Sequence, residues 1–165
     1  MRALIIVMLL ARVASADDVH VSFGMTGSSV DVSDRNGAGM VTEIKGLVND
    51  RVAVGGRVEV AVMFGGHVDA GELEVAMAAC GIAKAEVFLT DTKIRPFVGF
   101  GAGGYTVGSQ TALMSRTGRY FGIAPQVGID FDRLRFAATY NAILGQPAAA
   151  SQSYLSIELS FEFAR

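Results

Sequence analysis

Apolar and polar residues alternate along the closing segment of the chain, residues 153–163. Successive side chains of a β-strand point to opposite faces, so this segment predicts a strand with one apolar and one polar face. About ten residues is the length that a tilted strand needs to cross a bilayer. The apolar face consists of Leu155, Ile157, Leu159, Phe161 and Phe163, and the polar face of Ser156, Glu158, Ser160 and Glu162.

The same two-residue period recurs along the chain and predicts about eight strands. The fourth strand is the longest and its alternation is the least regular, which favours a β-bulge within it. The predicted strands are residues 19–26, 40–48, 52–64, 73–89, 94–100, 120–131, 134–141 and 153–163.

Short and long connections alternate between these strands. Tight turns are predicted at 49–50, 90–92 and 132–133, whereas the longer connections are rich in Gly, Ser, Asp, Gln and Ala. This alternation places the long loops at one end of an antiparallel barrel and both chain ends at the other. The sequence therefore predicts an all-β, eight-stranded antiparallel up-and-down transmembrane β-barrel. The long connections are residues 27–39, 65–71, 106–118 and 144–152.

The apolar rows would also suit a soluble, lipocalin-like barrel with an apolar interior. Such a barrel would carry many Lys and Glu on its other face, but these strands carry few charges, mixed with Gly, Ala and Ser. Hydrophobic residues make up 51% of the chain, yet no continuous apolar run after residue 16 has the length of a helical span. Apolar content spread by alternation favours the lipid-facing assignment.

The N-terminus has the order of an export signal. A basic start, Met1-Arg2, is followed by the apolar run 3–10 and the small-residue cleavage site Ala14-Ser15-Ala16. The apolar run is too short to span a bilayer as a helix. We therefore predict a cleaved signal peptide at residues 1–16, with cleavage near Ala16, and an outer-membrane β-barrel at 17–165.

Composition argues against several kinds of partner and cofactor. Cleavage would remove two arginines and change the net charge from −2 to −4, so nucleic-acid binding is not expected. Cys80 is the only cysteine, so neither a disulfide nor a thiol pair for a metal can form within the chain. His20 and His67 are predicted at opposite ends of the barrel. We therefore expect no cofactor and no metal site.

Two internal segments and the C-terminus resemble one known family. Residues 93–105, KIRPFVGFGAGGY, resemble the fifth strand of small OmpA/OmpX-type outer-membrane barrels, and residues 126–131 resemble their sixth. Phe161 and Phe163 resemble the C-terminal aromatic assembly signal of that class, although Ala164-Arg165 follow here.

The resemblance implies a monomer in the outer membrane of a Gram-negative-type envelope. Its implied partners are the barrel-assembly machinery, outer-membrane lipid and lipopolysaccharide, and an extracellular ligand that contacts the loops.

Charged residues fall on the face opposite the apolar rows. The interior of an eight-stranded barrel is just wide enough for side chains, so charges there must pair or stay hydrated. A paired ionic plug is favoured over a narrow hydrated conduit. The predicted lumen charge network is Glu43, Lys45, Arg57, Glu59, Glu74, Arg95, Arg135, Glu158 and Glu162.

Two motifs with catalytic or nucleotide-binding associations have simpler interpretations. Residues 99–104 satisfy G-x-G-x-x-G, but no helical period follows, which favours glycines that let a narrow lumen close. His67, Asp69 and Ser109 could imitate a hydrolase triad, but a solvated loop histidine is favoured.

We expect a non-catalytic structural or surface-interaction role through four extracellular loops. The alternatives are a narrow channel for small solutes or ions, and a lipid A-modifying enzyme.

Overall fold

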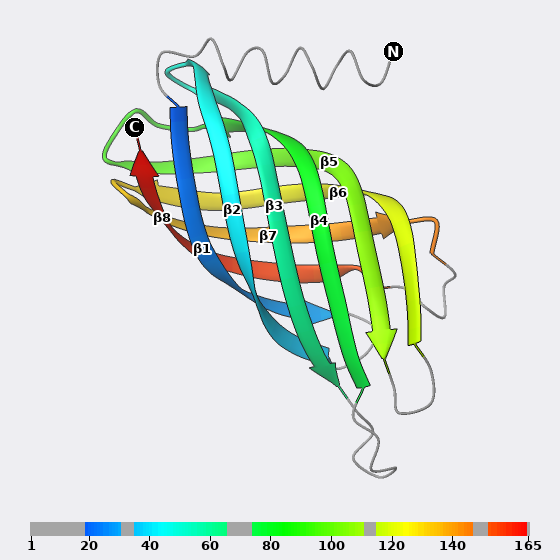
Figure 1. Cartoon of the computed structure of the whole chain (residues 1–165). Helices are drawn as coiled ribbons and strands as arrows, with labels where there is room; N and C mark the ends of the chain where they lie inside the picture. Colours follow the sequence, from blue (N-terminus) through cyan, green and yellow to red (C-terminus); the bar gives the residue numbers. More distant parts are fainter. Residues whose placement is uncertain (1–18, 31–34, 66–73, 111–114, 147–151, 165) are drawn as a thin grey trace.

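The computed structural model describes residues 19–30, 35–65, 74–110, 115–146 and 152–164. They form one closed antiparallel barrel in which each strand pairs with its sequence neighbours and β1 pairs with β8 (Figure 1). This confirms the predicted eight-stranded up-and-down barrel. The strands are β1 (Val19–Val30), β2 (Arg35–Asn49), β3 (Val52–Gly65), β4 (Glu74–Phe88), β5 (Ile94–Gln110), β6 (Ser115–Phe131), β7 (Leu134–Leu144) and β8 (Tyr154–Ala164).

The two faces of each strand differ sharply in exposure. On β8, Leu159 is 48% exposed, whereas its neighbours Glu158 and Ser160 are 1% and 2% exposed. The same pattern on the other strands surrounds the barrel with large apolar side chains and places charges inside it. This is the reverse of a soluble barrel and suits a lipid-facing surface. Among the described residues, no helix is long and apolar enough to cross a bilayer.

Strand β4 contains no bulge, so that prediction is wrong. Its register is unshifted along the whole of its pairing with both β3 and β5. Small residues on both faces weaken the apolar–polar contrast of this segment without disturbing its backbone ladder. The register shifts lie instead at Val21/Ser22 against β8 and at Leu47/Asn49 against β3.

Several strands extend further than predicted into segments that read as loops. β1 continues to Val30 and β2 begins at Arg35, so most of the predicted loop 27–39 is paired strand. Backbone hydrogen bonds need no apolar face, so Gly, Ser and Asn continue the ladder where apolar alternation has ended. We call this end of the barrel the loop end, and the end with the short turns, where β1 begins and β8 ends, the turn end.

The rim at the loop end is uneven because β5 and β6 are 17 residues long and β7 only 11. β6 pairs with β5 as far as Ser115, but its pairing with β7 stops where Phe121 lies opposite Leu144. Between residues 115 and 120, β6 therefore pairs on one side only among the described residues. Figure 1 shows this hairpin extending past the end of β7. We call residues 115–120 the β6 edge.

Candidate functional site

Nine charged side chains gather inside the barrel, toward the turn end. Strand alternation turns each of them inward, and six strands contribute. All are 5% exposed or less except Asp130, whose side chain is 14% exposed. We call this group the charge cluster: Glu43, Lys45, Arg57, Glu59, Lys84, Glu86, Asp130, Arg135 and Glu158.

Arg57 on β3 lies among three carboxylates. Its Nη1 donates to Glu43 Oε1 at 2.9 Å and to Glu158 Oε2 at 2.5 Å, and its Nη2 donates to Glu59 Oε2 at 2.6 Å. These contacts join β2, β3 and β8 across the interior. Glu59 has no other cation at ion-pair distance among the described residues, so it depends on Arg57 alone.

Arg135 on β7 forms a second centre. It donates to Glu86 and, at 3.0 Å, to Asp130 Oδ1. Its guanidinium carbon lies 3.9 Å from the centroid of the Phe97 ring, which is a cation–π distance. The aromatic face and the carboxylates together fix the orientation of this buried cation.

Two lysines connect these centres. Lys84 Nζ lies 2.6 Å from Glu43 Oε1 and 2.7 Å from Glu86 Oε1, and Lys45 Nζ lies 2.8 Å from Asp130 Oδ2. Each carboxylate of the charge cluster therefore has a cationic partner. Such pairing offsets the desolvation cost of burying charge.

The predicted lumen residues occupy three kinds of position. Glu162 lies at the turn end, where its Oε1 is 2.7 Å from His20 Nδ1. Arg95 lies opposite Asp130 on the neighbouring strand but forms no ion pair with a carboxylate among the described residues, and the side chain of Glu74 lies outside them. The remaining predicted residues, Glu43, Lys45, Arg57, Glu59, Arg135 and Glu158, belong to the charge cluster.

Three members of the charge cluster were missed from the sequence. Lys84 and Glu86 alternate with Ala83, Ala85 and Val87, so the two-residue period could have found them. Asp130 follows the same parity on β6, but it is not among the predicted lumen residues.

Toward the loop end the interior is apolar, which the prediction of an ionic plug did not anticipate. Tyr105 is 1% exposed, and its hydroxyl donates to Asn141 Oδ1 at 2.9 Å. This apolar layer at the loop end, together with the paired charges toward the turn end, leaves little room for a water-filled path through the barrel. The buried apolar cluster is Val30, Met63, Ala76, Ala78, Cys80, Ile82, Tyr105, Val107, Ala124, Ile143 and Tyr154.

Purified protein in planar lipid bilayers should therefore show no large, steady conductance. Side chains fill the interior as an apolar layer and a charged layer, and neither offers ions a hydrated route. Single-channel recording on monodisperse protein measures this directly. Porin-scale currents would show that the interior opens and would favour the channel hypothesis.

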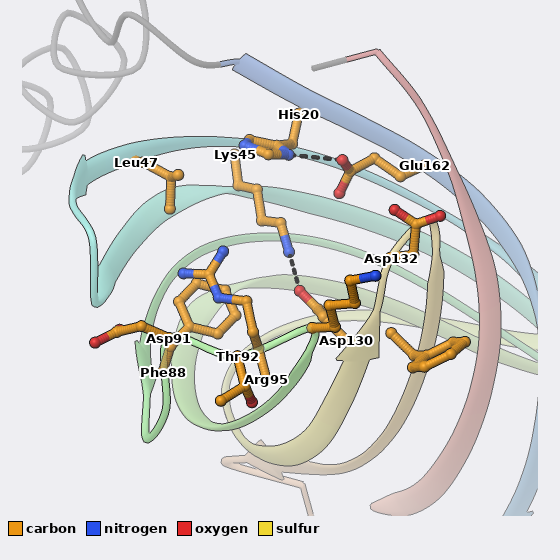
Figure 2. Close-up of a pocket in the computed structure, with 12 residues that line it drawn as sticks. His20, Lys45, Leu47, Phe88, Asp91, Thr92, Arg95, Asp130, Asp132 and Glu162 are labelled. Carbon is orange, nitrogen blue, oxygen red and sulfur yellow. Dashed lines mark hydrogen bonds and ion pairs between the residues drawn. The ribbon is translucent and has the colours of Figure 1, made fainter.

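A pocket of about 680 Å³ opens at the turn end (Figure 2). His20 and Glu162 lie on one side of it, and Phe88 and Arg95 lie on another. The Lys45–Asp130 ion pair is part of its lining, so the pocket borders the charge cluster. We call it the turn-end pocket.

The other candidate motifs do not form sites in the described residues. Residues 99–104 lie within β5, and a Cβ atom at Gly103 would lie 2.1 Å from the carbonyl oxygen of Gly81, so glycine permits close approach of β4. His67, Asp69 and the side chain of Ser109 lie outside the described residues. No group of His, Cys, Asp and Glu in the described part of the chain could hold a metal ion.

Comparison with known proteins identifies the fold. No protein-family model and no curated protein sequence matches this chain. Among solved structures, Neisserial surface protein A has a TM-score of 0.59 at 14% identity, covering 88% of this chain and 96% of that one. The chain has the fold of a small outer-membrane β-barrel.

Two further structures share this outer-membrane barrel fold. The attachment invasion locus protein Ail of Yersinia pestis, in complex with the heparin analogue sucrose octasulfate, has a TM-score of 0.57 at 13% identity and covers 88% of this chain and 98% of its own. The N-terminal β-barrel domain of OprF from Pseudomonas aeruginosa has a TM-score of 0.53 at 13% identity, covering 87% and 97%.

Proposed function

We propose that this protein is a non-catalytic, integral barrel of the bacterial outer membrane that binds an extracellular partner at its loop end. The observation that carries the proposal is the β6 edge. Of the 17 residues of β6, roughly ten suffice to cross a bilayer, so about seven extend beyond it. The sequence features of an export signal, the apolar outer surface and the fold of known outer-membrane proteins support the location.

No described residue pairs with β6 between 115 and 120 on the side that faces β7, and an unpaired edge of this kind is a template for another strand. Natural barrels close their sheets and so remove such edges, but here β7 stops at Leu144 and β6 continues. Extended peptides bind exposed edges of this kind through main-chain hydrogen bonds. The β6 edge therefore suits a partner with an extended segment.

The charge of the β5–β6 hairpin indicates the chemistry of the partner. Residues 106–120 contain Arg116 and Arg119 and no Asp or Glu. Electrostatic complementarity favours an extended segment that carries acidic side chains. A sulfated polysaccharide is the second candidate, because the same cations suit a polyanion and the structure of Ail contains a heparin analogue.

Shortening the hairpin should abolish partner binding. Tyr105 lies opposite Tyr120, so a two-residue Asn-Gly turn that replaces residues 106–119 removes most of the edge, including both arginines, and keeps the pairing of β6 with β7. The Arg116→Gln/Arg119→Gln variant keeps the edge and removes its charge. Binding of labelled protein to host-cell matrix and to immobilised heparin measures both candidates.

The two variants separate the two partners. If the partner adds a strand to the edge, the shortened hairpin should lose binding and the double glutamine variant should retain part of it. If the partner is a polyanion, both variants should lose heparin binding. Arg133→Gln, which removes an exposed cation at the turn end, is the control for overall charge. Full matrix binding by the shortened, folded barrel would contradict the proposed function.

The remaining features of the proposal concern export and assembly. A signal peptide cleaved near Ala16 would direct the chain out of the cytoplasm, and the barrel-assembly machinery would recognise Phe161 and Phe163. Both aromatic rings lie on the outer face, with their centroids 5.4 Å apart. The folded monomer would contact outer-membrane lipid and lipopolysaccharide through its apolar surface.

A further inference from the structure

The turn-end pocket has the volume of a small-molecule site. Its volume of about 680 Å³ falls within the roughly 300–1,000 Å³ that such sites occupy. Charged side chains surround it beside the aromatic ring of Phe88 (Figure 2). It lies at the opposite end of the barrel from the β6 edge, so an inference about it does not depend on the proposed function.

The carboxylates that line this pocket already have partners. Asp132 takes part in a further interaction, and the other three form ion pairs. A bound cation would therefore have to displace an existing partner. The pairs are Asp91 with Arg51 at 3.1 Å, Asp130 with Lys45 at 2.8 Å and Glu162 with His20 at 2.7 Å.

The lining cations are less completely engaged. Among the described residues, no carboxylate lies at ion-pair distance from Arg95 or Lys93. Arg95 Nη2 donates to the backbone carbonyl oxygen of Asp50 at 2.8 Å, but its buried Nε has no hydrogen-bond partner. The buried Nε2 of His20, which is 7% exposed, is also without a hydrogen-bond partner. The unused positively charged donor of the pocket is therefore the Nε–H group of Arg95.

Arg95 is also held in a fixed orientation. Its guanidinium carbon lies 3.9 Å from the centroid of the Phe88 ring, so the planar group stacks on the aromatic face and keeps its edge for hydrogen bonding. A planar guanidinium presents paired N–H donors that match the oxygens of a carboxylate or phosphate. Preorganisation of this kind lowers the entropic cost of binding.

We propose that the turn-end pocket binds a small solute through an oxyanion, a carboxylate or a phosphate group, that accepts hydrogen bonds from Arg95. Lys93, in the turn that precedes β5, adds a second positive charge at the pocket. Four carboxylates and three Lys or Arg side chains line the pocket, which gives a formal net charge of −1 with His20 neutral. The lining therefore offers a polyanion no net attraction, and a small anion would bind through the local donors of Arg95.

Titration of the full-length, refolded barrel in detergent micelles tests this proposal. Benzoate and inorganic phosphate are the probes, benzamide is the neutral control, and isothermal titration calorimetry at low salt is the measurement. We expect saturable binding of at least one oxyanion and none of benzamide. Preference for benzoate identifies a carboxylate site, and preference for phosphate identifies a phosphate site.

Arg95→Gln should weaken the binding of the preferred anion by at least about tenfold, which corresponds to about 1.4 kcal/mol. Arg133→Gln, an exposed cation at the same end that does not line the pocket, should leave the Kd unchanged. If Arg95→Gln does not fold, judged by gel mobility before and after boiling, Arg95→Lys replaces it. This variant keeps the charge without the paired donors, and it should weaken binding several-fold.

The proposal fails if neither anion binds saturably to the folded wild-type barrel. It also fails if the folded Arg95 variant binds as tightly as the wild type. Equal weakening by Arg133→Gln would show general attraction by surface charge, which would equally overturn a site at Arg95.

Discussion

Replacing Arg57 by methionine should lower the free energy of unfolding by about 3–5 kcal/mol. The substitution keeps a long side chain but removes the cation that pairs with Glu43, Glu59 and Glu158. Glu43 retains Lys84, whereas Glu59 is left buried without a cation among the described residues. Urea titration of protein refolded into lipid vesicles measures the change in the free energy of unfolding. Circular dichroism reports the unfolding, because the chain contains no tryptophan.

Two further variants test whether the cost arises from a stranded buried carboxylate. Arg51→Met removes an exposed arginine that also forms an ion pair, with Asp91, and should cost less than about 1 kcal/mol. Glu59→Leu in the Arg57→Met background should recover part of the lost stability. If Arg57→Met were as mild as Arg51→Met, the charge cluster would not be buried as the structure places it.

Replacing Leu159 by arginine should cost about 2–4 kcal/mol in vesicles. Leu159 lies near the middle of β8, with Met25 and Phe136 opposite it on the neighbouring strands, and its side chain is 48% exposed on the apolar outer face. A charge there would enter the hydrocarbon core. The same urea titration, together with the yield of folded protein in cell membranes, measures the effect.

Two variants are the matched controls: one changes the depth of the new charge in the membrane, and the other lies on the opposite face of the strand. Leu134 lies on the same outer face at the turn end, where β7 begins. Because this position is near the membrane interface, Leu134→Arg should cost only about 0–1 kcal/mol. Glu158→Leu removes one of three carboxylates around Arg57 and should not stabilise the protein. Tolerance of Leu159→Arg combined with stabilisation by Glu158→Leu would mean that the two faces are inverted.

Strict alternation made the eight strands and their faces predictable. In β8, each large apolar residue from Leu155 to Phe163 lies outside, because a two-residue period permits only one assignment once a face is chosen. The same parity turned Glu43, Arg57 and Glu158 inward. The choice of the outer face depended on the polar row, which carries few charges mixed with Gly, Ala and Ser. In the structure the apolar row lies on the outside of the barrel.

Features that depend on three-dimensional neighbours were not predictable from one strand at a time. Glu43 pairs with Arg57 and Lys84, two residues on different strands, and no local pattern specifies those partners. The apolar layer was missed because its members, such as Met63, Tyr105 and Ile143, lie on separate strands and meet only in the closed barrel. The turn-end pocket needed the closed barrel, because six strands and the turns between them line it.

The charge cluster also has a consequence for the route by which the barrel forms. The Arg57–Glu158 contact joins residues 101 positions apart, so it can form only after the last strand has reached the first half of the chain. Any partly inserted sheet would hold unpaired charges in a medium of low polarity, at a cost of several kcal/mol for each. Insertion and closure should therefore be concerted, with little accumulation of half-built sheets. The buried charges would all be paired only after the complete ring of strands has formed.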